Sequence, residues 1–365
     1  MAVRKTRIGE LDALRVVASI AVVAIHVLAA GYTARGDAGN AAPWVFNSYT
    51  FIWFATPAFA FLTGALVWNY RPITTLADYA SFLRRRASVV LYPYLFWSAF
   101  YIIYQRYTPM ELRPQLPLGE FIIDIGRLLV LGRASFHLYF LPIVIIFYVV
   151  APLVSAAFRR QPFLTFLGLW GLGAFGTLIL PRPTSPHLVS LYRVFELTMW
   201  LLPAAAAGGL YGAIRTRYSS VLRRVWPLLL FGGLFMRWYD RGPLHIDIVW
   251  IQRATETLYL AVTIIGLACL LELITRNRHR LARTAQTLGV GAFGVYIIHP
   301  IGIAVVSDAV DAAGAHSLWQ SGPFTIAVTG LVVAVSYGVV LAARQVPALS
   351  WVFGMPARRT PQGAQ

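Results

Sequence analysis

Ten long apolar segments separated by polar connections set the hydrophobic pattern of this 365-residue chain, in which 58% of the residues are hydrophobic. Because a helix needs about 20 apolar residues to cross the ~30 Å hydrocarbon layer of a bilayer, each segment is a candidate membrane span. The pattern predicts an all-α, polytopic integral membrane protein with about ten transmembrane helices. The segments are Leu11–Gly31, Ser48–Trp68, Ser88–Arg106, Leu138–Phe158, Phe163–Leu180, Phe195–Ile214, Trp226–Tyr239, Ile251–Leu273, Leu288–Val306 and Phe324–Ala343.

The seventh segment, Trp226–Tyr239, is shorter than the others. As a helix it rises only about 21 Å, which is less than the hydrocarbon thickness. We therefore expect this helix to begin earlier, near Val221, or to be tilted and sheltered by its neighbours.

Basic residues are distributed unequally between the two sides of the predicted spans. The two termini and the connections on their side hold 20 of the 31 Lys and Arg residues, and the opposite side holds 10. The positive-inside rule then places both termini in the cytoplasm. The first span contains Arg15 and lacks a small-residue cleavage pattern, so it is kept as a span. We expect a multi-pass protein of the plasma (inner) membrane.

The predicted domain organisation is simple. The sequence has no repeat of fixed period, no low-complexity tract and no linker, so residues 1–343 are expected to form one transmembrane domain and residues 344–365 a short cytoplasmic tail. On the non-cytoplasmic side, the loop Thr108–Ser135 contains Leu118–Leu131, which is expected to lie in the interface as a short helix. That loop and Asp240–Asp247 are candidates for substrate recognition, although loops are normally polar.

The formal net charge of +17 would also suit a nucleic-acid-binding protein. However, the basic clusters Arg84–Arg86 and Arg276–Arg280 directly flank apolar spans, where basic residues set topology and contact lipid headgroups. No nucleic-acid partner is therefore expected. Cys269 is the single cysteine and falls within the eighth span, which excludes an intrachain disulfide and a cysteine metal site. No His, Asp and Glu set has a convincing metal-ligand spacing, so no metal is expected.

Arg15 and His26 lie inside the first apolar segment, where ionisable side chains are costly and usually kept for a function. Arg15 and His26 are eleven positions apart, so they fall within about 20° of one helical face and about 16 Å apart along the axis. Asp12 lies close to the same stripe and is expected to hold the guanidinium. The alternative is that Arg15 reaches the cytoplasmic headgroups and His26 bonds a neighbouring helix.

Five segments resemble the membrane acyltransferase 3 family. Leu11–Arg15 and the apolar run to His26 match the family signature, in which ten residues separate an Arg from a His. The others follow in the order of the family: Thr56–Gly64, Arg84–Arg86 leading into Tyr92–Tyr94 and Trp97, His137–Pro142 with Tyr139 in the place of a Trp, and Gly294–Pro300 with a Tyr-x-x-His-Pro pattern. The resemblance extends from Leu11 to Ala343.

One departure concerns Ala87 and Ser88, which follow the triple arginine where many members have a further basic residue. It leaves open which arginine would meet the phosphates of an acyl donor. The short polar tail favours a likeness to stand-alone exopolysaccharide or lipid-linked glycan O-acyltransferases.

The resemblance implies an O-acyltransferase that moves an acyl group, commonly acetyl from acetyl-CoA, to a hydroxyl of an extracytoplasmic or lipid-linked carbohydrate. The implied partners are membrane lipids, the carbohydrate acceptor and the acyl-CoA donor. Acyl-CoA is a co-substrate, so no permanently bound cofactor is expected. The alternative is a transporter or flippase for a glycan or an acyl-carrying intermediate, which would also need buried charges and many helices.

An alcohol is a weak nucleophile at neutral pH, so this reaction needs a general base. His26 suits that role because free imidazole has a pKa of about 6.5, and Arg15 is expected to hold anionic or polar groups of the donor. His299 is expected at a comparable depth, where it would orient the base or donate to the oxyanion. An acyl-histidine relay and a merely packed histidine are the alternatives. Tyr296, one turn earlier, is a candidate to orient the His299 ring.

The remaining candidates are peripheral. Arg84, Arg85 and Arg86 are candidate ligands for CoA phosphates, although arginines before a span are expected from topology alone. His137 and Tyr139, at the outer start of the fourth span, are weaker candidates for the acceptor side.

Overall fold

The computed structural model describes residues 9–33, 48, 50–69, 73–104, 117–180, 182–241 and 248–355. Within these residues all regular structure is helical. Among the described residues, eight helices are long and apolar enough to cross a membrane, and a ninth span is counted if the bent pair α7 (Phe140–Val149) and α8 (Ala151–Arg160) crosses as one. The prediction of an all-α, multi-pass membrane protein is confirmed. The helices cluster into two compact units, which are described separately.

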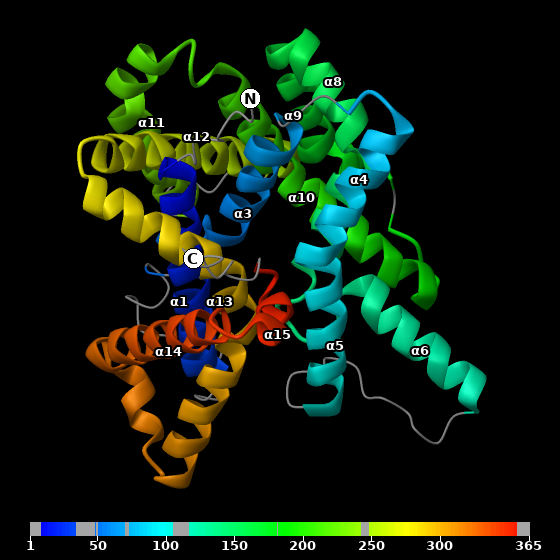
Figure 1. Ribbon diagram of the computed structural model, residues 1–365, viewed down its shortest axis with the longest axis vertical. Coiled ribbons are helices and arrows are strands. Elements are labelled where there is room, and N and C mark those ends of the chain that lie inside the picture. Colours follow the sequence, from blue (N-terminus) through cyan, green and yellow to red (C-terminus); the bar gives the residue numbers. More distant parts are fainter. Residues whose placement is uncertain are drawn as a thin grey trace, which may run out of the picture. The chain divides into compact units, whose positions relative to one another are not determined.

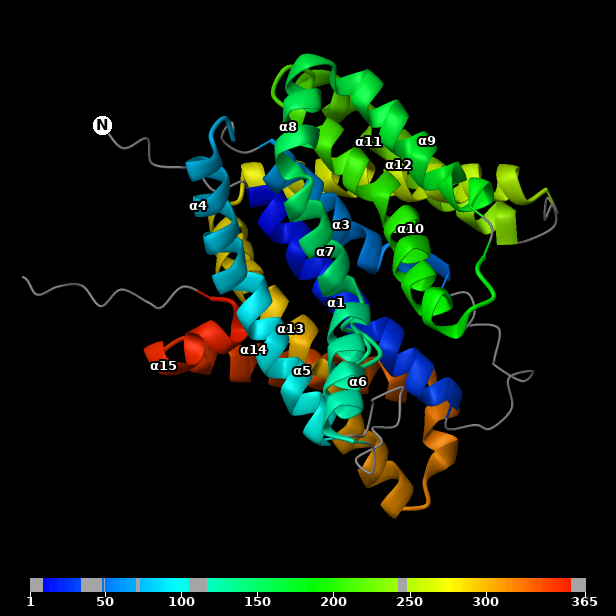
Figure 2. The same ribbon diagram turned by 90° about the vertical axis from the view of Figure 1, so that its right-hand side faces the viewer.

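The first unit combines residues 1–62 with residues 214–343. Within it, α1 packs along α13 and also contacts α12 and α14, while α11 packs along α12 (Figures 1 and 2). Its helices are α1 (Gly9–Thr33), most of α3 (Ala55–Thr63), α11 (Ser219–Arg241), α12 (Val249–Arg276), α13 (His279–Ala312), the short 3-10 helix η3 (His316–Gln320) and α14 (Gly322–Ala343).

Glycines allow close helix contacts in this unit. A Cβ atom at Gly289 of α13 would lie 2.9 Å from the backbone oxygen of Asp12 on α1. A Cβ atom at Gly266 of α12 would lie 2.4 Å from the backbone nitrogen of Leu230 on α11. Small residues at such points let helix backbones approach, as is typical of membrane helix pairs.

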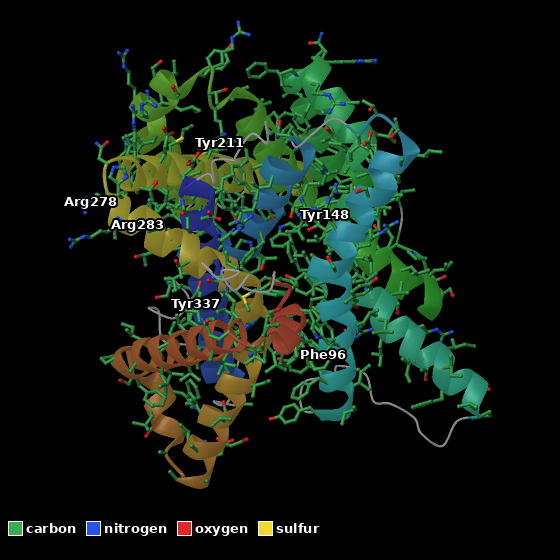
Figure 3. All side chains as sticks on the ribbon, viewed as in Figure 1. Phe96, Tyr148, Tyr211, Arg278, Arg283 and Tyr337 are labelled. Carbon is green, nitrogen blue, oxygen red and sulfur yellow. The ribbon has the colours of Figure 1, made fainter. Side chains whose placement is uncertain are left out.

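Ion pairs hold one end of the first unit. Arg215 pairs with Glu10 in the first turn of α1, and Arg223 near the start of α11 pairs with Glu272 near the end of α12 at 3.2 Å. Because Glu272 is one turn from the end of α12, the exposed arginines of the α12–α13 turn belong to the same end. Figure 3 labels two of them, Arg278 and Arg283.

The second unit combines residues 63–213 with residues 344–365. Two short π-helical turns interrupt its helices, and the second joins α4 to α5 within one apolar span, Leu76–Tyr104. Besides α7 and α8, its elements are η1 (Gly64–Trp68), α4 (Leu76–Arg86), η2 (Ala87–Leu91), α5 (Tyr92–Tyr104), α6 (Leu118–Leu131), α9 (Pro162–Ile179), α10 (Pro186–Ile214), α15 (Pro347–Ser350) and η4 (Trp351–Phe353).

Local sequence signals explain several helix ends in this unit. Thr75 caps α4 through a reciprocal bond with Asp78, which is a capping box. Gly132 ends α6 with a φ of 64°, a left-handed conformation that glycine adopts without steric penalty. The predicted helix Leu118–Leu131 is confirmed with these bounds.

Two predicted spans differ in detail from the structure. The seventh lies within α11, a helix of 23 residues that begins at Ser219, so the expectation of an earlier start is correct. That helix is not among the eight candidate spans. The fourth is bent by 63° between α7 and α8, where Pro152 follows the break. The count of ten spans and the side of the termini stay predictions.

The beginning of the predicted C-terminal tail is packed. Trp97 of α5 donates its indole N–H to the backbone oxygen of Val352 at 2.9 Å, and the rings of Phe96 and Trp351 make an edge contact with centroids 5.6 Å apart. Val352 and Phe353 are buried. This part of the tail is a component of the second unit, whereas residues 356–365 lie outside the described residues.

Other sequence expectations also fall partly outside the described residues. These are the basic residues before Ile8, the loop segment 105–116 and the loop segment 242–247. The proposed recognition roles of the two outer loops stay predictions.

Candidate active site

The arginine of α1 is held by the carboxylate that the helical spacing predicts. Arg15 forms an ion pair with Asp12, one turn earlier. The Asp12 side chain is 4% exposed and that of Arg15 is 32% exposed. Asp12 also lies opposite Gly289 of α13, where an added Cβ atom would be 2.9 Å from the Asp12 backbone oxygen and 3.2 Å from its Cβ atom. Asp12 is therefore packed between α1 and α13, and its carboxylate holds a partly accessible guanidinium on the face of α1.

A hydroxyl pair fixes α1 against α14 between the arginine and the histidine. The Ser19 hydroxyl donates to the backbone oxygen of Val16 at 2.8 Å, and its oxygen lies 2.9 Å from the hydroxyl of Tyr337. Because the single hydroxyl hydrogen of Ser19 is used, the Tyr337 hydroxyl is the donor in the second bond. Figure 3 shows Tyr337 on α14.

The two predicted histidines lie together. The rings of His26 on α1 and His299 on α13 are stacked, with centroids 5.2 Å apart and an interplanar angle of 22°. Asp12 meets Gly289 and, further along both helices, His26 meets His299. The two helices therefore run parallel, as their predicted directions in the membrane require. Arg15, Ser19 and His26 lie within about 40° of one another around α1, so they share one face.

A proline determines how His299 is held. Pro300 has no N–H, so the carbonyl of Tyr296, four residues earlier, loses its regular helical donor. His299 Nδ1 lies 2.8 Å from this Tyr296 oxygen and 3.3 Å from the oxygen of Val295. A carbonyl only accepts, so Nδ1 carries the proton, and in the neutral ring Nε2 has a lone pair.

The two histidines differ in how far they are buried. His299 is 0% exposed, whereas His26 is only half-buried. The accessible ring therefore belongs to α1, and the ring behind it is fixed by its own helix. This geometry favours an orienting role for His299, because a neutral ring protonated at Nδ1 has no Nε2 hydrogen to donate to an oxyanion.

An aromatic side chain, Tyr296, contacts the histidine pair and is itself packed against two further rings. The Tyr296 ring is tilted against His299 with centroids 6.3 Å apart, and it also contacts Phe59 of α3 at 6.0 Å and stacks on Phe293 at 6.5 Å. Tyr296 therefore supports His299 twice, through its backbone carbonyl and through its ring. The prediction that Tyr296 orients the ring agrees with this arrangement, and its effect on activity stays a prediction.

The second unit holds the predicted donor-side arginines. Arg84 and Arg85 are exposed at the end of α4, and Arg85 donates to the hydroxyl of Ser81 at 2.8 Å. Arg86 differs from them, because its guanidinium lies over two aromatic rings, 5.4 Å from that of Phe82 and 5.3 Å from that of Tyr148. Of the three, Arg84 and Arg85 are the ones placed to meet a soluble anion.

The predicted acceptor-side residues also belong to the second unit. His137 is 1% exposed, its Nδ1 lies 3.1 Å from the hydroxyl of Ser135, and its ring makes an edge contact with Tyr101 at 5.3 Å. Tyr139 is half-buried and directly precedes α7. The burial of His137 favours a packing role, and an acceptor role for either residue stays a prediction.

One buried cation escaped the sequence analysis. Arg237 of α11 is 3% exposed, and its guanidinium lies over the rings of Tyr259 at 5.0 Å and Trp53 at 5.7 Å. The sequence feature that could have identified it is its position inside the seventh apolar segment. It lies near the end of that segment, where an interfacial arginine is ordinary, so its burial became visible only once α11 was paired with α12.

No group of three or more His, Cys, Asp or Glu side chains among the described residues is arranged to hold a metal ion. The groups at and near the histidine pair are imidazole rings, a guanidinium, a carboxylate and hydroxyl groups. Such groups carry out proton transfer and hold anions.

Comparison with family sequence models gives a match to the acyltransferase 3 model, described as an acyltransferase domain, over residues 8–342. The match covers nearly the whole chain, including both histidines and all the arginines discussed above. Comparisons with curated proteins and with solved structures gave no match.

Proposed function

The chain belongs to the acyltransferase 3 family, and on that premise we propose that it transfers acetyl from acetyl-CoA to a hydroxyl of an extracytoplasmic or lipid-linked carbohydrate. It would do so in the plasma (inner) membrane with both termini in the cytoplasm. The observation that carries the proposal is the stacked pair of His26 and His299, placed on the same face of α1 as the Arg15–Asp12 ion pair.

His26 acts as the general base in this proposal. Its ring takes the proton from the acceptor hydroxyl as the hydroxyl oxygen attacks the thioester carbonyl carbon. The tetrahedral intermediate then collapses, the carbon–sulfur bond breaks, and the imidazolium returns the proton to the departing thiolate. The products are the acetyl ester and CoA thiol, and the base is regenerated.

His299 acts by positioning the base. Its ring stacks on His26 and is held by the Tyr296 carbonyl, so it limits the orientations that His26 adopts. A base held in one productive orientation loses less entropy on reaching the transition state. Transfer then occurs directly from donor to acceptor, without an acyl-histidine intermediate.

Arg15 binds the donor. The pantetheine arm of CoA has about as many chain bonds as four residues, so it spans about 15 Å when extended. The helical rise from Arg15 to His26 is about 16 Å, which would place a phosphate of CoA at the guanidinium and the thioester at the base. A guanidinium is well suited to this contact because it binds phosphate through two parallel hydrogen bonds. Within the second unit, Arg84 and Arg85 are, by the family resemblance alone, separate candidates to bind donor phosphates.

The experiment that tests this function uses purified protein in proteoliposomes with acetyl-CoA and a glycan acceptor. Release of CoA thiol is followed with a thiol reagent, and Cys269 is buried and contributes little background. We expect CoA release that depends on the acceptor, together with an acetylated glycan in the mass spectrum. Movement of the glycan across the membrane without CoA release would instead establish a transporter.

A further inference from the structure

Arg237 is enclosed by the rings of two aromatic residues inside the first unit. Its guanidinium lies 5.0 Å from the ring of Tyr259 on α12 and 5.7 Å from the ring of Trp53, which precedes α3. The residue is 3% exposed. A buried arginine inside a membrane bundle is costly, and it is usually kept where it contributes to a site for substrate or ions.

The chemistry of this cluster suits an anionic group attached to a sugar. Aromatic rings attract the guanidinium through its faces. A guanidinium also carries five N–H donors in its plane, more than one neighbouring acceptor can use, and this fork matches carboxylate and phosphate oxygens. Trp and Tyr rings also offer apolar faces with a polar edge, a combination that fits a sugar ring.

A nearby hydroxyl adds a second observation. Thr263 lies one turn after Tyr259 on α12, is 3% exposed, and its hydroxyl has no hydrogen-bond partner. It packs on Gly233, one turn before Arg237 on α11, where a Cβ atom would come within 2.2 Å of the hydroxyl oxygen. A buried hydroxyl that lacks a partner is unfavourable unless a ligand or water satisfies it.

The cluster is remote from the end of the unit that we assign to the donor. The Arg223–Glu272 ion pair joins α11 to α12 at that end. Arg237 lies 14 residues along α11 from Arg223, and Tyr259 lies 13 residues along α12 from Glu272, a rise of about 20 Å on each helix. In the proposed orientation this is the outer half of the membrane, from which an extracytoplasmic acceptor arrives.

The short stretch of chain from Trp53 to Phe59 connects this cluster to the histidine pair. Trp53 contacts Arg237, and Phe59, six residues later, contacts Tyr296 of the His299 support. A ligand held at Trp53 and Arg237 is thus bound by the segment that also borders the base.

We propose that Arg237, Trp53 and Tyr259 form an acceptor subsite that binds an anionic group, a carboxylate or a phosphate, of the carbohydrate. This inference rests on the proposed function and narrows it to acidic acceptors. The Arg237 guanidinium binds the anionic group, and the sugar ring packs on the aromatic side chains. The hydroxyl to be acylated is then presented toward His26.

Equilibrium binding tests the subsite without any need for turnover. Purified protein in nanodiscs, with no acetyl-CoA, is titrated with glucuronate, glucose 6-phosphate and glucose, which share a ring and differ in the group at carbon 6. We expect at least tenfold tighter binding of one charged sugar than of glucose. A preference for glucuronate identifies the carboxylate of an acidic sugar, and a preference for glucose 6-phosphate identifies a phosphate.

Variants then assign that preference to Arg237. We expect Arg237→Gln to abolish it and Arg237→Lys, which keeps the charge but loses the fork, to weaken it. Tyr259→Leu should weaken binding of all three sugars. The control is Arg193→Gln, because the Arg193 side chain is 66% exposed in the second unit, and its removal should leave binding unchanged.

Two results would overturn the subsite. One is equal binding of the three sugars by the unaltered protein. The other is a preference that survives in folded Arg237→Gln, or in folded Arg237→Lys if the Gln variant does not fold. Failure of the acetyl-transfer reaction alone leaves these binding results unaffected, so the two proposals are tested separately.

Discussion

His299 donates its Nδ1 hydrogen to the backbone oxygen of Tyr296 at 2.8 Å, and this oxygen lacks its regular helical donor because residue 300 is a proline. His299 and Pro300 thus act together on the Tyr296 carbonyl, and we call this arrangement the His299–Pro300 motif. The proline frees an acceptor, and the histidine side chain occupies it. The result is a ring with a defined proton position behind the accessible ring of His26.

Replacing Pro300 with alanine tests the His299–Pro300 motif. Alanine restores an N–H that competes with His299 Nδ1 for the Tyr296 carbonyl, so the ring loses part of its restraint. We expect kcat to fall about tenfold, equivalent to about 1.4 kcal/mol and in the range of one hydrogen bond, while the KM for acetyl-CoA stays the same. Steady-state kinetics at saturating donor measures this change.

Pro227 provides the matched control, because it also lies inside a helix of the first unit. Pro227→Ala restores an N–H remote from the histidine pair and should leave kcat unchanged. If both variants lower kcat to the same extent, the effect of Pro300 is a general effect on helix geometry. That result would contradict the role given to the His299–Pro300 motif.

Replacing Gly289 with alanine tests the contact that buries Asp12. The added methyl group would come within 2.9 Å of the Asp12 backbone oxygen, so α13 must move away from α1. We expect a loss of about 1–3 kcal/mol of stability, typical of overpacking, and reduced transfer because the histidine rings separate. Thermal unfolding in detergent and the rate of CoA release are the measurements. Gly330→Ala on α14 is the control, because the added Cβ atom would meet no neighbouring atom within 4 Å. This substitution should be neutral or slightly stabilising.

The three arginines of α4 should respond differently to neutralisation. Arg84→Gln combined with Arg85→Gln is expected to raise the KM for acetyl-CoA about tenfold with kcat unchanged, because these exposed side chains contribute uniform binding. Arg86→Gln is expected to lower stability by about 1 kcal/mol through loss of its contacts with Phe82 and Tyr148. A rise in donor KM in Arg86→Gln alone would reverse this assignment.

The sequence was informative where the determining interactions are local. The apolar lengths located the helices, and the early start of α11 and the bounds Leu118–Leu131 followed from segment length and composition. The 3.6-residue period placed Arg15 and His26 on one face with Asp12 beside them. The direction of successive spans then brought His299 to the depth of His26, and the stacked rings agree with it.

Features that depend on nonlocal packing could not be read from the sequence. The burial of Arg237 requires the pairing of α11 with α12 and the position of Trp53, which no local pattern encodes. The docking of Val352 against Trp97 depends on a contact between residues 255 positions apart. Pro300 by itself leaves the Tyr296 carbonyl without its regular helical donor, but only the position of the His299 ring shows which donor replaces it.

The rate of acetyl transfer by His26→Gln most directly tests the central claim that an imidazole of α1 is the general base. The measurement is a single turnover in proteoliposomes with saturating acetyl-CoA and acceptor, at matched protein levels, with acetyl-CoA binding measured separately. We predict a loss of at least about 100-fold in the transfer rate, as removal of a general base produces, with donor binding unchanged. Transfer by the folded variant at the rate of the unaltered protein would contradict the mechanism.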